Sequence, residues 1–98
     1  MELESLWRAH SAAPFPDGMD PSDRRWDGVD LLATDSQLAG TIDSVISRGQ
    51  PASVDERRRQ AEGIAELDAV EHLMSETDRP YFQRLKEMAH LAMLVARR

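Results

Sequence analysis

The stretch TDRPYFQRLKEMAHLAMLVARR, residues 77–98, decides the fold. On a helix, its apolar residues cover about 200° of the circumference. Such a helix cannot lie on a surface with one side in water, so other segments must enclose it. Thr77 is a suitable N-cap, and Pro80 fits the first turn, where its missing N–H is not needed. The apolar face comprises Tyr81, Leu85, Met88, Ala89, Leu91, Ala92 and Val95, and Phe82 and Met93 widen it.

Two helices are predicted in the first half of the chain. Residues 2–11 carry the narrow apolar stripe Leu3, Leu6 and Trp7, and the prolines that follow end this helix. A second helix is predicted over residues 35–48, with Thr34 or Asp35 as N-cap and Gly49 as the stop. Its start stays open, because Leu31 extends the same apolar face if the helix begins near Asp30.

A third helix is predicted to begin at Ser53, which forms a capping-box pattern with Glu56, and to continue to about Glu76. Gly63 lies on its apolar face, which favours a close helix crossing at that point. The connection to residues 77–98 is short, so these two helices should be antiparallel neighbours.

These patterns predict an all-α fold. No stretch of the sequence alternates polar and apolar residues as a strand does. We expect a single helical domain over residues 1–98, a small bundle of three long helices plus a short N-terminal helix. A long irregular loop, residues 12–29, connects the first two helices.

Composition narrows the classes of partner. The chain has 18 acidic and 12 basic residues and a net charge of −6, which argues against nucleic acid as a partner. It contains no cysteine, so disulfides and thiolate metal ligands are excluded. The first residues do not resemble a signal peptide, and no apolar stretch is long enough to cross a bilayer. We therefore expect a cytoplasmic protein that does not enter a membrane.

The loop over residues 12–29 is longer than most connections in a compact domain, and such loops are often functional, disordered or wrapped on the surface. In the interpretation that we favour, Phe15 and Trp26 anchor an irregular wrap onto a small core. In the alternative, the loop shapes a binding pocket. The candidate pocket residues are His10, Phe15, Trp26, Asp27 and Asp30.

No catalytic or metal-binding pattern is evident. His10, His72 and His90 do not form a helical zinc pair, and we expect each to lie at the surface or to be hydrogen-bonded. The aspartates of the loop lack the spacing of a calcium loop. We therefore expect no metal, no cofactor and no enzymatic activity.

Surplus apolar residues indicate an interface. Leu94 interrupts the polar strip of the last helix, and Leu73 lies away from the main face of the third. Either the helix over residues 2–11 lies across the last helix, or a second copy of the chain covers it in a two-fold dimer. The candidate interface residues are Leu73, Leu91, Leu94, Gly40 and Ser44, the last two from a small-residue face of the second helix.

The expected function is that of a non-enzymatic helical interaction protein that forms a homodimer, binds another protein, or does both. One alternative is an acidic inhibitor of the immunity or antitoxin kind, which presents loop carboxylates to a basic target. Another is a small-molecule binder at the N-terminal loop.

Several stretches of the chain resemble small bacterial helical proteins of unknown function with a similar opening. These stretches are the run LWRAHSAAPFP at residues 6–16, GVDL at 28–31, the stretch from Asp35 through Gly40 that ends in LAG, and the later YFQRL at 81–85. The resemblance implies no activity, cofactor or catalytic residue. It directs attention to the N-terminal half of the chain.

Overall fold

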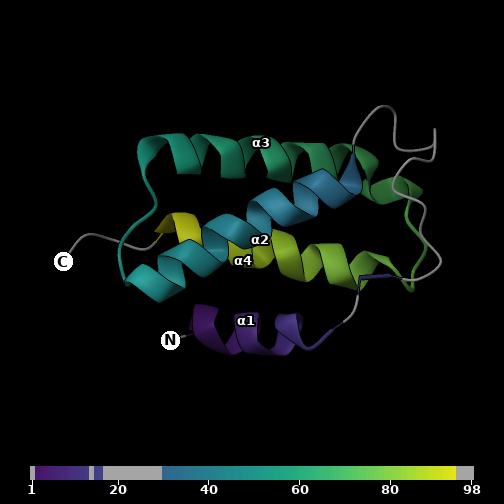
Figure 1. Ribbon diagram of the computed structural model, residues 1–98. Helices are drawn as coiled ribbons and strands as arrows, with labels where there is room; N and C mark the ends of the chain where they lie inside the picture. Colours follow the sequence, from purple (N-terminus) through teal and green to yellow (C-terminus); the bar gives the residue numbers. More distant parts are fainter. Residues whose placement is uncertain (1, 14, 17–29, 95–98) are drawn as a thin grey trace.

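The computed structural model describes residues 2–13, 15–16 and 30–94, and over these residues the fold is an all-α bundle (Figure 1). The elements are α1 (Glu2–Ser11), α2 (Leu31–Arg48), α3 (Val54–Val70), the 3₁₀ helix η2 (Glu71–Leu73) and α4 (Arg79–Leu94). Helices α2 and α4 form the middle of the bundle, with α3 along one side and α1 along the other. This confirms the predicted fold class.

Helix α4 is enclosed on several sides, as its wide apolar face requires. Its side chains Phe82, Leu85, Met88, Ala89 and Ala92 have no exposed surface. They pack against the buried residues of α2 and α3, and α1 adds Leu3. Phe82, expected at the margin of the apolar face, lies fully inside, whereas Tyr81 and Leu91 are only partly buried. The helix over residues 2–11 packs against the last helix, in agreement with one of the two predicted ways of covering it, although it lies alongside the bundle (Figure 1).

The structure decides the start of α2, which the sequence had left open between Asp30 and Asp35. Asp30, and not Thr34 or Asp35, is the N-cap, because its side chain accepts a hydrogen bond of 3.0 Å from the Ala33 N–H. This earlier start places Leu31 in the core, where it is fully buried. Thr34 is buried as well, and its hydroxyl donates to Glu66 of α3 at 2.7 Å. Its side chain therefore joins two helices and does not cap one.

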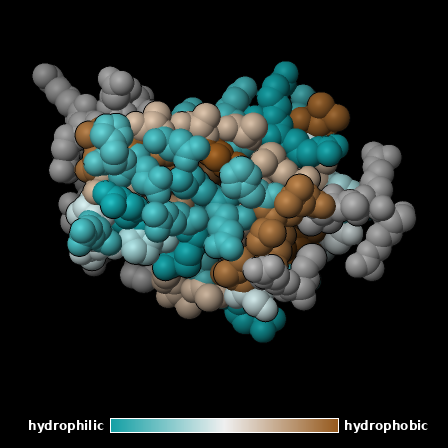
Figure 2. Space-filling model, turned by 180° about the vertical axis from the view of Figure 1, so that it is seen from behind, coloured by the Kyte–Doolittle hydropathy of each residue, from teal (hydrophilic) through white to brown (hydrophobic). Residues whose placement is uncertain are grey.

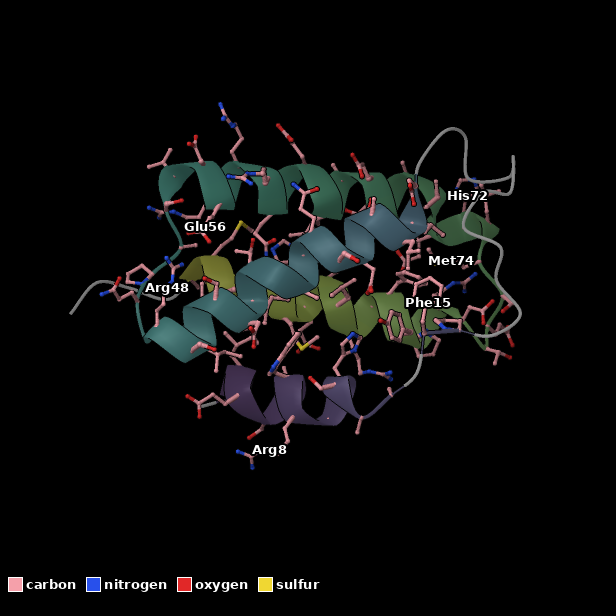
Figure 3. The ribbon with its side chains drawn as sticks, viewed as in Figure 1. Arg8, Phe15, Arg48, Glu56, His72 and Met74 are labelled. Carbon is pink, nitrogen blue, oxygen red and sulfur yellow. The ribbon has the colours of Figure 1, made fainter. Side chains whose placement is uncertain are left out.

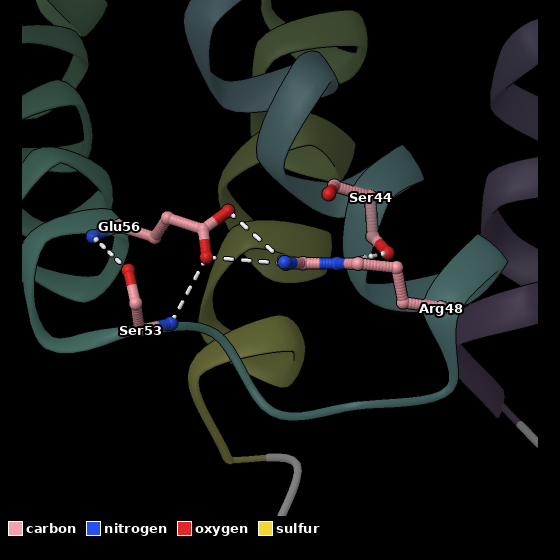
Figure 4. Close-up of polar contacts among 4 residues, drawn as sticks. All are labelled: Ser44, Arg48, Ser53 and Glu56. Atoms are coloured by element: carbon pink, nitrogen blue, oxygen red, sulfur yellow. Dashed lines mark hydrogen bonds and ion pairs between the residues drawn. The ribbon is translucent and has the colours of Figure 1, made fainter.

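The turn between α2 and α3 follows the predicted signals (Figure 4). Gly49 adopts the left-handed conformation, with φ of 63°, and ends α2. Ser53 and Glu56 form the predicted capping box. The Glu56 carboxylate also accepts from Arg48 at 3.1 Å, while Arg48 Nε donates to the Ser44 carbonyl. The end of α2 is thus tied to the start of α3.

The connection from α3 to α4 differs from the expected one. The α-helix ends at Val70, before the predicted Glu76, and η2 follows. Ser75, and not Thr77, accepts the hydrogen bonds of the turn that leads into α4: its Oγ accepts from the Asp78 N–H at 3.1 Å, and its carbonyl accepts from the Arg79 N–H at 3.0 Å. Pro80 then lies in the first turn of α4, as predicted.

Close packing and one ion-pair cluster fix α3 against its neighbours. A Cβ atom on Gly63 would lie 2.7 Å from Leu38 Cδ2, so the close crossing predicted there is present between α3 and α2. Lys86 of α4 contacts both Asp68 at 2.6 Å and Glu71 at 2.8 Å. None of the helices in the described ranges is both long and apolar enough to cross a membrane.

Candidate functional site

An aromatic cluster joins α1 to the start of α4. The His10 ring lies 4.5 Å from the Tyr81 ring, centroid to centroid. Phe15 meets both Tyr81 and Phe82 edge-on, at 5.7 Å and 5.9 Å. Figure 3 shows Phe15 beside the first part of α4, whereas Arg8 projects from the outer side of α1. Edge-to-face contacts of this kind are favourable beyond simple burial.

His10 is the unusual member of this cluster. Only 4% of it is exposed, and neither ring nitrogen has a hydrogen-bond partner among the described residues. Burial lowers the pKa of His10, and the positive charge of Arg84 lowers it further. His10 therefore does not lie at the surface, and none of the described residues gives it the hydrogen bond that was the other possibility predicted from the sequence. A short apolar stripe did not indicate that the end of α1 would be pressed against α4.

Asp35 and Tyr81 form the polar edge of the cluster. The Tyr81 hydroxyl donates to Asp35 Oδ1 at 2.9 Å, which joins α4 to α2. Burial raises the pKa of Asp35, although the hydrogen bond from Tyr81 opposes that shift. The pKa of Tyr81 is also raised, by burial and then by the bond to Asp35. Both groups therefore favour their neutral forms more than they would in water.

The structure brings together part of the predicted pocket. His10 and Phe15 both contact Tyr81. Asp30 is exposed and caps α2. Trp26 and Asp27 lie outside the described residues. The sequence pattern alone does not indicate Asp35, Tyr81 and Arg84 as members of the site, because only the packing of α1, α2 and α4 brings them near His10.

The predicted interface residues differ in exposure. Leu94 is 75% exposed at the end of α4, and Leu91, one turn earlier, is partly buried against the core. Leu73 is also partly buried against the core. Gly40 is exposed, and no atom lies within 4 Å of where its Cβ would be. Ser44 is partly buried, and its carbonyl accepts from Arg48.

The remaining candidate groups are solvated. His72 and His90 are exposed. In the part of the chain that the structure describes, no three histidine or acidic side chains lie close enough to hold a metal ion. Arg58 pairs with Asp55 at 3.0 Å on the exposed side of α3.

Over the described residues, the fold and the site define a small α-bundle in which α1, the shortest α-helix, carries a buried histidine at its contact with α4. No protein-family model, curated protein or solved structure matches this chain. The resemblance to small bacterial proteins with a similar opening stays a prediction.

Proposed function

We propose that the protein is a non-enzymatic helical interaction protein that pairs with a second copy of itself, or with another protein, through the end of α4. We also propose a cytoplasmic location, which the cysteine-free sequence favours. The observation that carries the proposal is the exposure of Leu94, the last residue of α4, whose other large apolar side chains are wholly or partly buried.

The surroundings of Leu94 support an interface. Leu91 lies three residues earlier on the same helix and keeps part of its surface exposed. Figure 2 shows the most extensive hydrophobic patch of this face at its lower right. Val54, at the start of α3, is 76% exposed. In a two-fold dimer the same patch is used by both copies, so a modest apolar surface is buried twice.

The experiment compares the mass in solution of the parent chain and of the Leu94→Lys variant by sedimentation equilibrium. We expect the parent to be dimeric at micromolar concentration and the variant to be monomeric, because the new lysine would place two like charges across the two-fold axis. The unfolding free energy of the variant should change by less than about 0.5 kcal/mol, since the side chain is exposed.

A matched control is Leu32→Lys, which adds the same charge at an exposed leucine near the start of α2. This variant should keep the mass of the parent. A monomeric parent chain at every concentration would contradict the dimer, and dissociation by both variants would contradict the assignment to the end of α4.

A second candidate function is the binding of a small molecule at the aromatic cluster. The ring nitrogens of His10 favour this function, because they lack a hydrogen-bond partner among the described residues. The His10 ring contacts Tyr81, which is bonded to Asp35. A polar ligand bound there could supply the missing hydrogen bond. Titration of the tryptophan fluorescence with a panel of metabolites tests this function. A response that the His10→Phe variant loses would support it, and flat titrations of the parent would exclude it for that panel.

A further inference from the structure

We propose that protonation of His10 releases α1 from the body formed by α2, α3 and α4. Helix α1 is ten residues long, and a helix of that length has little stability of its own in water. Its attachment depends on few side chains. Among residues 3–11, Leu3 and His10 are buried, while Leu6 and Trp7 are partly buried. A change at His10 therefore affects a large share of the contact between α1 and the other helices.

The surroundings of His10 suit a neutral ring and not a charged one. From α4, the Tyr81 ring contacts the His10 ring at a tilt of 40°, and Arg84 supplies a positive charge. From α2, the acid that borders the cluster is Asp35, whose Oδ1 already accepts the Tyr81 hydroxyl. On α1 itself, Arg8 is exposed and of the same sign. A protonated His10 would carry two N–H donors in a place where the described residues provide no acceptor.

The direction of the pH effect follows from this arrangement. The pKa of His10 in the folded chain lies below the ordinary value of 6.5, so the folded state binds the proton less tightly than the unfolded or released state. The contribution of the neutral ring to stability is therefore complete above about pH 6.5 and decreases as the pH falls through that value toward the folded-state pKa. Asp35 acts in the opposite sense at lower pH, because its raised pKa lets it take up a proton in the folded state.

The release should be local. Helices α2, α3 and α4 contact one another and share a buried core, whereas α1 contributes Leu3 to that core and lies at its edge. Protein segments open in separate units whose stability reflects their buried contacts. Release of α1 would expose apolar surface on α2 and α4 without unfolding the bundle of α2, α3 and α4.

Hydrogen exchange of the intact chain, read by mass spectrometry, tests the proposal at about pH 7.5 and about pH 5, on either side of the ordinary histidine pKa. After correction for the intrinsic exchange rate at each pH, the amides of residues 2–11 should lose their protection at the lower pH, while α2, α3 and α4 keep theirs. The His10→Phe variant retains an aromatic ring on Tyr81 but cannot be protonated, and it should keep α1 protected at both pH values.

His90→Phe is the matched control, because His90 is exposed on α4, and this variant should lose protection as the parent does. Arg84→Gln removes the positive charge near His10 and should diminish the loss of hydrogen-exchange protection of α1 at the lower pH. A second measurement does not depend on folding of His10→Phe. In an NMR titration of the parent chain, the ring of His10 should titrate below the ordinary histidine pKa of 6.5. Unchanged protection of α1 in the parent, or titration of the His10 ring at or above that ordinary value, would overturn the proposal.

Discussion

Two polar residues, His10 and Gln60, are buried without a hydrogen bond among the described residues. Gln60 of α3 has no exposed surface, and neither its Oε1 nor its Nε2 finds a partner there. An unpaired amide in a protein interior costs about 1–3 kcal/mol relative to the same group in water. His10 lies at the edge of the bundle, where its ring can change charge, whereas Gln60 does not titrate. The first residue can therefore respond to pH, and the second only lowers stability.

The variant Gln60→Met tests the cost of the buried amide. Methionine keeps the unbranched shape of glutamine but removes the two unpaired polar atoms, so the free energy of unfolding should rise by about 1–3 kcal/mol. The same change at the exposed Gln83 should have little effect and serves as the control. Urea unfolding at neutral pH gives both values. Destabilisation by Gln60→Met would mean that the amide has a partner after all.

Among the helices, α2 and α3 show how far local signals determine an element. The capping box at Ser53 and the helix end at Gly49 each depend only on residues close together in the sequence, and both predictions were confirmed. The start of α2 had been left open between Asp30 and Asp35, and the start of α4 was misplaced. Asp30 provides the capping oxygen of α2, and Ser75 accepts a hydrogen bond in the turn before α4. In both places several suitable residues stand close together in the sequence. Burial of Leu31 accompanies the earlier start of α2, and a short-range pattern does not contain that information.

The two helical glycines Gly63 and Gly40 give a matched test of the close crossing between α2 and α3. Alanine favours a helix over glycine by about 1 kcal/mol. At Gly40 nothing lies within 4 Å of the new Cβ, so Gly40→Ala should stabilise the protein by about that amount. At Gly63 the Cβ would meet the buried Leu38 at 2.7 Å, and the resulting overpacking, about 1–3 kcal/mol, should outweigh the gain.

Thermal or urea unfolding of the two single variants measures these opposite signs. Equal stabilisation by Gly63→Ala and Gly40→Ala would show that α3 has room to move away from Leu38, and would contradict the tight crossing.

For the whole molecule, the wide apolar face of the last segment predicted correctly that other helices enclose its described helix, α4. The candidate site was only partly predictable. His10 and Phe15 were identified from their own neighbourhood, but their partners Tyr81, Arg84 and Asp35 come from α4 and α2. These contacts depend on the position along the axis of α4 at which α1 packs. A periodic pattern defines which face of a helix is buried, but not which residue lies opposite.

The hydrogen bonds among Ser44, Arg48, Ser53 and Glu56, which join the end of α2 to the start of α3, have a consequence for the order of folding. All of these contacts lie close together in the sequence, and closing so short a loop costs little chain entropy. We therefore expect the α2–α3 hairpin to assemble early, with α4 added next. Helix α1, separated from α2 by a long connection, should dock last, so the segment that completes the native state would also be the first to leave it.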